Sequence, residues 1–320
     1  MCNYRYYSII HNMGKQRILW IDCLKGIGIL SVVFVHITGR MALFVYAIPL
    51  FFMLSGYLFH KQPIAGYAIK TARRMVMPYI VFLLIISSLV YGQEITKMGG
   101  VILRGGVALT AELGTFWFSG VLFLTLMLFN LMSEGIRAWV CIAAFVVANL
   151  VNHFELFLPL NIQAVPIALF YMTAGNIIKK YLPTSEFGRI VEEKINPIAI
   201  GIIAVLGVVI LALPDVFLDI KYNNYGIPVV SILLSLVMVA IVAVLCVRIA
   251  KVPVIGKFLA FCGKASLFIM FVHQYVHFRI FASQGRLITL FGTIALSLLL
   301  YIAAMRWRTT RLMLCGEIKK

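Results

Sequence analysis

Charged residues are scarce in this 320-residue sequence: they make up 12% of the chain, and only 11 of them are acidic. A soluble globular domain is about one quarter charged and roughly half apolar. Here 62% of the residues are hydrophobic and the mean hydropathy is +1.02. The shortage of charge therefore excludes an ordinary soluble domain and predicts an integral membrane protein.

Three further features are missing. No internal repeat is visible and no connection is long enough to hold a separate soluble domain, so we expect one polytopic domain. The first twelve residues lack a long apolar core and a small-residue cleavage site, which argues against a signal peptide and leaves Met13 as an alternative start. The cysteines show no paired spacing, so we expect neither structural disulfides nor a metal site. They are Cys2, Cys23, Cys141, Cys246, Cys262 and Cys315.

Long apolar segments fill most of the chain. About twenty apolar residues cross a bilayer as a helix, and ten segments qualify: 20–38, 42–59, 75–92, 115–133, 136–151, 160–178, 197–213, 227–249, 258–278 and 287–305. The sequence therefore predicts an all-α polytopic membrane protein, with about ten transmembrane helices in one bundle.

The net charge of +17 is best explained by membrane topology. Basic residues lie at the ends of the apolar segments and form no patch interleaved with aromatics, so we expect no nucleic-acid partner. With the N-terminus inside, 22 of the 28 Lys and Arg residues fall on the cytoplasmic side. This asymmetry follows the positive-inside rule, and an even number of helices places both termini in the cytoplasm.

The first apolar segment carries a polar stripe. Lys25 and His36 are eleven residues apart, which places them on one helix face about 16 Å apart along the axis, and Asp22 shares that face. Polar groups inside a membrane helix are costly and usually face a protein interior or a water-filled cavity. His36 could simply bond a neighbouring helix carbonyl, but the stripe favours a buried base. We expect Lys25 and His36 to share one cavity open to the cytoplasm.

Two later motifs are ambiguous on their own. Ser55 and Gly56 are small enough for close helix packing, which alone would account for them. Arg73 and Arg74 could hold phosphate groups through charge-assisted hydrogen bonds. The residues alone favour the ordinary interpretation of these arginines as anchors on the positive inner side.

The order of these motifs resembles the membrane-bound acyltransferase 3 family. The resemblance rests on the run from Arg17 to His36, in which Lys25 and His36 match a basic-X10-His element, and on Phe51-Phe-Met-Leu-Ser55-Gly56. Further matches follow in the family's order. They are the basic segment before Pro78-Tyr79, the run Phe116-Trp117-Phe118, and the run Gly263-Lys-Ala-Ser266 through His273.

The resemblance implies an enzyme of the bacterial inner membrane that takes an acyl group, usually acetyl, from cytoplasmic acyl-CoA. The acceptor would be a hydroxyl of a surface polysaccharide or a lipid-linked sugar, and the other partner is membrane lipid. His36 would be the general base or a transient acyl carrier, with Lys25 and Asp22 setting the local field. The donor would be bound by Arg73, Arg74, Arg17, Ser55 and Gly56.

The resemblance also suggests a division of the chain. Residues 1–16 would be a cytoplasmic segment, 17–306 the transmembrane acyltransferase domain and 307–320 a basic cytoplasmic tail.

Other polar residues carry weaker indications. Trp117 could stack on a sugar or on adenine, although an interfacial anchor is slightly favoured. His273 and His277 are four residues apart, a spacing that suits metal ligands, but no third ligand is evident and bundle hydrogen bonding is favoured, with His273 near the cavity. His153 and Glu155 could contact the acceptor, or simply belong to a solvated loop.

Two other functions remain open at this stage. A buried polar stripe and proline-interrupted helices also suit a transporter of glycans or small solutes, and an inactive relative could assist polysaccharide assembly. The acceptor sugar, the acyl group and the oligomeric state are left undetermined by the sequence.

Overall fold

The computed structural model describes residues 18–92, 109, 111–152 and 158–316. Within these ranges the chain is helical and contains no strand, apart from one isolated bridge between Asp219 and Asn224. Arg17, His153 and Glu155, three of the predicted site residues, lie outside the described residues.

The helices of the first half are α2 (Leu19–Thr38), α3 (Phe44–Ala47), α4 (Pro49–Tyr57), α5 (Ile64–Thr71), α6 (Met77–Tyr91), α8 (Trp117–Leu131) and α9 (Arg137–Val151). Those of the second half are α10 (Val165–Tyr181), α11 (Thr184–Glu193), α12 (Pro197–Ala212), α13 (Pro228–Ile249), α14 (Pro253–Lys264), α15 (Ser266–Arg279), α16 (Arg286–Arg306) and α17 (Arg308–Cys315). A π-helical segment, η2 (Ala72–Val76), joins α5 to α6. Five 3-10 turns complete the elements: η1 (Met41–Leu43), η4 (Ala111–Leu113), η5 (Glu134–Ile136), η6 (Pro159–Ala164) and η7 (Ile220–Tyr222).

Helix boundaries follow local sequence chemistry. α2 stops at Thr38 because Gly39 takes a left-handed conformation (φ 74°) and its amide donates to the Val35 carbonyl. α12 begins where the Asn196 side chain accepts a hydrogen bond of 2.8 Å from the Ala199 amide, with Pro197 in the first turn.

Each of the ten predicted apolar segments is mainly helical, but they are not ten straight spans. Among the described residues, seven helices are long and apolar enough to cross a membrane, or up to nine if two bent helix pairs each form one span. Those pairs are α11 with α12, bent by 112°, and α14 with α15, bent by 80°. The predicted span 42–59 is instead a shorter apolar stretch, Met41–Tyr57. Pro49 lies inside it, and because proline cannot donate the backbone hydrogen bond, the helix restarts there as α4.

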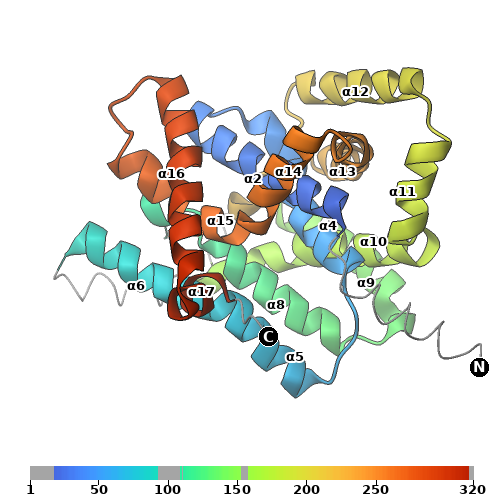
Figure 1. Cartoon of the computed structure of the whole chain (residues 1–320). Coiled ribbons are helices and arrows are strands. Elements are labelled where there is room, and N and C mark those ends of the chain that lie inside the picture. The colour runs from blue at the N-terminus through green and yellow to red at the C-terminus, as the bar shows by residue number, and fades with distance from the viewer. Residues whose placement is uncertain (1–17, 93–108, 110, 153–157, 317–320) are drawn as a thin grey trace, which may run out of the picture.

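Two glycines bring α2 and α14 into close contact. A Cβ atom at Gly26 would lie 2.0 Å from the Leu259 carbonyl oxygen, and one at Gly263 would lie 1.9 Å from the Asp22 carbonyl oxygen. Larger residues cannot occupy either position without moving a backbone. The contact fixes the Asp22 and Lys25 end of α2 against α14 (Figure 1).

A second glycine pair joins α4 to α10. A Cβ at Gly56 would lie 1.8 Å from the Met172 carbonyl oxygen, and one at Gly175 would lie 1.9 Å from that of Met53. Small residues allow this kind of close packing between membrane helices.

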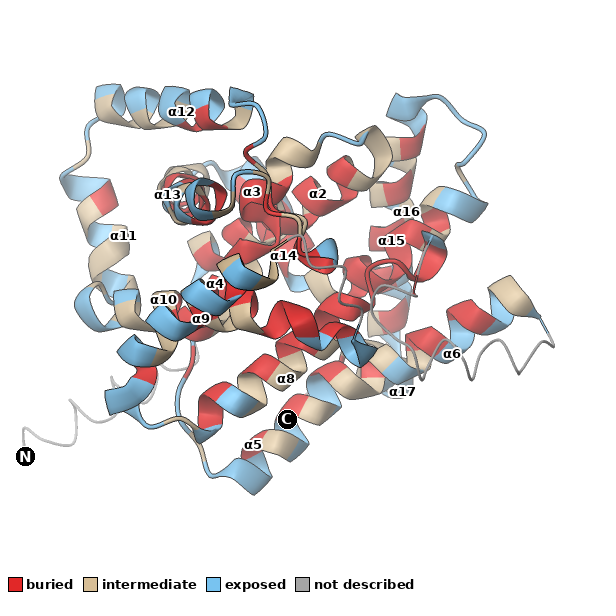
Figure 2. Cartoon of the chain, turned by 180° about the vertical axis from the view of Figure 1, so that it is seen from behind, coloured by how far each residue is buried: buried red, intermediate tan, exposed pale blue. Residues whose placement is uncertain are grey.

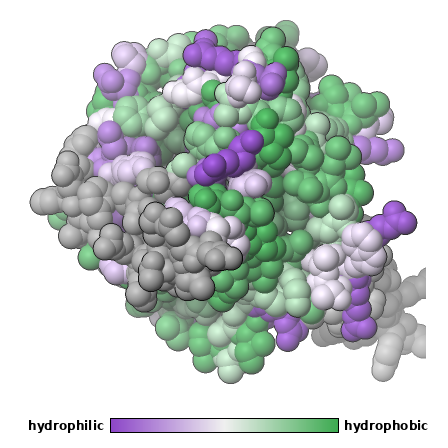
Figure 3. Space-filling model, turned by 90° about the vertical axis from the view of Figure 1, so that its left-hand side faces the viewer, coloured by the Kyte–Doolittle hydropathy of each residue, from purple (hydrophilic) through white to green (hydrophobic). Residues whose placement is uncertain are grey.

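The surface of the bundle is suited to lipid. α2 and α15 are largely buried at the centre, whereas α12 is exposed along most of its length (Figure 2). Its exposed side chains are apolar, as with Ile198 (76% exposed) and Val208 (66%). Figure 3 shows one face of the molecule, where hydrophobic side chains cover broad areas and strongly hydrophilic ones form small groups, most of them toward the edges. With its long apolar helices, the chain is a multi-pass membrane protein.

Candidate functional site

A cavity of about 670 Å³ opens among α2, α4, α5, η2, α8 and the α14–α15 bend. We call it the basic cavity because four cationic side chains line it: Lys25, Lys70, Arg74 and Lys264. Asp22, whose Oδ1 lies 3.9 Å from Lys25 Nζ, also lines it. The resulting excess of positive charge suits a ligand with several negative charges.

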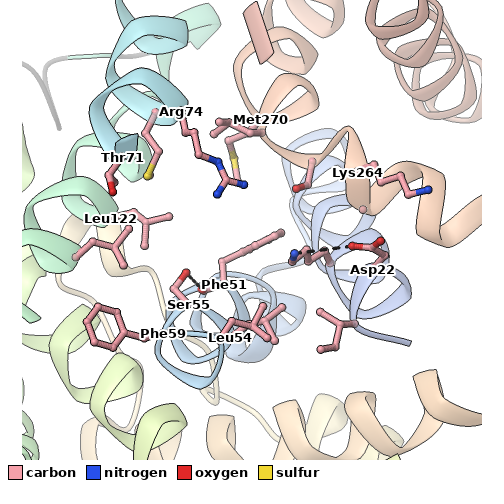
Figure 4. A pocket seen from close by; sticks show the side chains of 18 of the residues that line it. Asp22, Phe51, Leu54, Ser55, Phe59, Thr71, Arg74, Leu122, Lys264 and Met270 are labelled. Atoms are coloured by element: carbon pink, nitrogen blue, oxygen red, sulfur yellow. Dashed lines mark hydrogen bonds and ion pairs between the residues drawn. The ribbon is translucent and has the colours of Figure 1, made fainter. Parts of the chain in front are cut away.

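The π-helical turn η2 presents one of its two arginines, Arg74, to the basic cavity. Arg73 and Arg74 both lie in this turn, but Arg74 lines the basic cavity and Arg73 is not among its lining residues. Figure 4 shows the Arg74 side chain and the Phe51 ring both extending toward the middle of the space. π-Turns inside α-helices occur frequently at functional sites. The structure therefore separates two arginines that the sequence treats alike.

Ser55 and Gly56 also have different environments. Ser55 lines the basic cavity, and its hydroxyl donates to the Phe51 carbonyl at 2.7 Å. Gly56 does not line the cavity; it packs against the α10 backbone at Met172. Helix packing is sufficient to explain Gly56.

His36 lines a second cavity, of about 310 Å³, which we call the histidine cavity. The expectation that Lys25 and His36 share one cavity is wrong: Lys25 lines only the basic cavity and His36 only the histidine cavity. Between the two polar groups, the Phe51 side chain of α4 packs against α2, since a Cβ at Gly28 would lie 3.2 Å from its ring. Phe118 and Met270 line both cavities.

A second imidazole orients His36. His273 is fully buried on α15; its Nδ1 lies 2.7 Å from the Ile269 carbonyl oxygen and its Nε2 lies 3.1 Å from His36 Nδ1. Since a carbonyl can only accept, Nδ1 of His273 carries the proton and Nε2 of the neutral ring is an acceptor. His36 Nδ1–H must then be the donor. This arrangement leaves His36 Nε2 as the unprotonated nitrogen of the pair.

The connection between α12 and α13 supplies opposite charges to the histidine cavity. Lys221 and Asp219 both line it, and Lys221 Nζ donates to the Leu109 carbonyl at 2.6 Å. Burial lowers the pKa of Lys221 to about 8, although the nearby Asp219 carboxylate opposes that shift. Burial likewise raises the pKa of Asp219 to about 6. Near pH 7 one positive and one negative group face the cavity.

Two further polar side chains of the histidine cavity come from α8 and α15. Trp117 lines it and is 7% exposed, so the expectation of an interfacial anchor is wrong. The side chain of Gln274 is also buried there, and its Oε1 has no hydrogen-bond partner among the described residues. A buried acceptor without a partner is costly and suits a ligand that can donate a hydrogen bond.

His277 does not line either cavity, and its ring stacks on Phe278. Among the described residues, no group of three or more His, Cys, Asp or Glu could hold a metal ion.

Sequence reasoning missed Lys221, Asp219 and Gln274 as site residues. A short polar stretch separates two apolar segments here: Asp219-Ile-Lys221-Tyr-Asn-Asn-Tyr-Gly226. Its polar composition is the signal that could have identified it as part of a site.

The sequence profile described as an acyltransferase domain matches residues 18–306. The chain belongs to the membrane-bound acyltransferase 3 family, and the protein is a membrane acyltransferase. Comparison with curated proteins and with solved structures gave no match.

Proposed function

We propose that the protein transfers a short acyl group, acetyl above all, from cytoplasmic acyl-CoA in the basic cavity to a sugar hydroxyl in the histidine cavity. The acceptor is a surface polysaccharide or a lipid-linked sugar, and the membrane is the bacterial inner membrane. The observation that carries this proposal is the pair of cavities with different charge on either side of Phe118 and Met270.

The basic cavity suits the donor. Coenzyme A carries several phosphate charges, and Arg74, Lys70 and Lys264 provide cations that can bind them. Lys25 on α2 adds a fourth cation to the same cavity. Arg73 does not line this cavity, so we assign it the ordinary role of a basic residue that anchors a helix end on the cytoplasmic side.

The histidine cavity suits a neutral polyol. The charges of Lys221 and Asp219 balance, so an anion gains little there, while hydroxyl groups can both donate and accept hydrogen bonds. Gln274 Oε1 needs a donor, and Trp117 offers an aromatic surface. These features favour a carbohydrate over a lipid chain.

His36 acts as the general base in this scheme. Its Nε2 takes the proton of the acceptor hydroxyl while that oxygen attacks the thioester carbonyl carbon, forming the C–O bond. The C–S bond then breaks, and the imidazolium returns the proton to the departing sulfur. The products are the sugar ester and free coenzyme A. His273 keeps His36 in the required tautomer through the 3.1 Å hydrogen bond.

The test uses purified protein in nanodiscs with radiolabelled acetyl-CoA and a panel of methyl glycosides. His36→Ala should lose transfer by 100-fold or more, since general bases contribute roughly 10²–10⁴-fold, while His277→Ala serves as the matched control. Full activity in His36→Ala would refute the assignment. Solute flux into liposomes without acyl-CoA would instead support a transporter. Accumulation of a labelled His36 adduct would make His36 an acyl carrier rather than a base.

A further inference from the structure

Apolar side chains lie where the two cavities meet. On α2, Lys25 lines the basic cavity and Val32 lines the histidine cavity. The seven-residue step between them corresponds to about 10 Å along a helix. Phe51 packs against α2 within this interval, because a Cβ at Gly28 would lie 3.2 Å from its ring. An acyl group delivered from one side must therefore cross a narrow apolar zone.

Two residues border this zone on both sides. Phe118 on α8 and Met270 on α15 line the basic and the histidine cavity alike. Met270 lies three residues before His273, so the two share one face of α15, about 4.5 Å apart along the axis. The reacting carbon must pass beside Met270 to reach His36.

The two bordering side chains differ in mobility. The Phe118 ring is held by neighbouring rings, with centroid distances of 5.2 Å to Phe52 and 5.8 Å to Phe51. Met270 is unbranched and has three rotatable bonds, so it can change rotamer at low cost. Its backbone is held meanwhile, because the Thr115 hydroxyl donates to the Met270 carbonyl at 2.6 Å. The side chain can move aside without displacing the helix.

We infer that Phe118 and Met270 form the constriction that admits the acyl group to His36 and that their bulk limits the transferred group to a short chain. This inference rests on the proposed function. The chemical step is unchanged: the thioester C–S bond breaks, the ester C–O bond forms, and His36 moves the proton from the hydroxyl to the sulfur. The constriction decides which acyl groups can reach that position.

Binding of S-ethyl-, S-butyl- and S-hexyl-coenzyme A tests the inference without an acceptor. These thioethers cannot transfer a group, and their affinities are measured with protein in nanodiscs. Methylene groups that do not fit an apolar pocket cost about 10-fold or more. We expect wild-type protein to bind the ethyl compound at least 10-fold more tightly than the hexyl compound.

Met270→Ala removes three heavy atoms from the constriction and should reduce that ratio about 10-fold, with little change for the ethyl compound. Met238→Ala is the matched control, because Met238 is a buried methionine on α13 that lines neither cavity. Phe118→Leu replaces Met270→Ala if the latter does not yield folded protein, with the same expectation.

The outcomes separate the two proposals. If no thioether binds to wild-type protein, acyl-CoA is not the donor and the proposed function fails together with the inference. If all three bind with the same dependence on chain length in wild-type and variant proteins, the constriction is wrong and the donor assignment stands. A smaller ratio in Met270→Ala but not in Met238→Ala supports the constriction.

Discussion

Replacing His273 should slow the reaction without weakening substrate binding. His273 lines neither cavity, so it acts as a positioning residue through His36 rather than by touching a substrate. Three substitutions separate its two hydrogen bonds. In His273→Gln the amide group occupies the region of Nε2, and in His273→Asn it occupies the region of Nδ1. His273→Phe keeps a ring of similar volume but has no hydrogen-bonding group at either position.

The expected magnitude follows from the contacts. Losing the 3.1 Å bond removes the contact with His273, while the His36 ring keeps a hydrogen bond with the Val32 backbone, and a typical hydrogen bond contributes about 0.5–1.5 kcal/mol. Since about 1.4 kcal/mol corresponds to tenfold in rate, His273→Phe and His273→Asn should lower kcat about 3- to 10-fold. His273→Gln, which can still accept from His36, should stay close to the wild-type rate.

The assay measures initial rates of acetyl transfer to the best methyl glycoside over a range of donor and acceptor concentrations. KM should stay unchanged in all three variants, while kcat per amount of folded protein in nanodiscs falls in His273→Phe and His273→Asn. Equal losses in His273→Gln and His273→Asn would refute the orienting role, because only the former keeps the acceptor for His36. A rise in KM with unchanged kcat would place His273 in substrate binding instead.

Three other predictions follow from the geometry. Arg74→Ala should raise the KM for acyl-CoA about 10-fold, as expected for a charge-assisted contact, whereas Arg73→Ala should leave it nearly unchanged; equal effects would contradict the different directions of the two side chains. Gly56→Ala should prevent correct assembly, since its Cβ would meet a carbonyl oxygen at 1.8 Å, and Gly66→Ala, with nothing within 4 Å, should not; yields of monodisperse protein in detergent distinguish them. Lys221 has a pKa of about 8 in the folded protein and 10.5 ordinarily, so the unfolded chain binds more protons between these values and folding stability rises with pH there. Relative to Lys221→Met, the wild-type protein should gain on the order of 2–3 kcal/mol between pH 7.5 and 10.5, measured by thermal unfolding in nanodiscs; a constant difference would refute the buried charge.

Membrane helices and the polar stripe of α2 are predictable because each depends on residues close together in the sequence. Apolar runs of about twenty residues determine the helices, and the 100° rotation per residue places Lys25 and His36 on one face. The number of straight spans is harder to predict. Hydropathy alone does not reveal the break at Pro49 or the 80° bend between α14 and α15.

The composition of the site depends on contacts between distant segments. His36 and His273 are 237 residues apart, and only the packing of α15 against α2 makes them a pair. The sequence does not single out Lys221, because its burial results from how the α12–α13 connection folds over the cavity. Arg73 and Arg74 are neighbours in one helical turn and point in different directions, but which of them faces the cavity depends on how η2 packs against α8. The topology, the division into segments and the roles of individual site residues stay predictions.

The apolar side chains between the two cavities also bear on the proton gradient across the membrane. Two hydrogen-bonded imidazoles inside a membrane resemble the proton relays of pumps. If water filled both cavities continuously, protons could hop through His36 and His273 and discharge the transmembrane gradient. Each proton crossing 100 mV releases about 2.3 kcal/mol. Phe51, Phe118 and Met270 place apolar side chains between the two polar cavities, so substitutions that admit water there should let protons leak across the membrane.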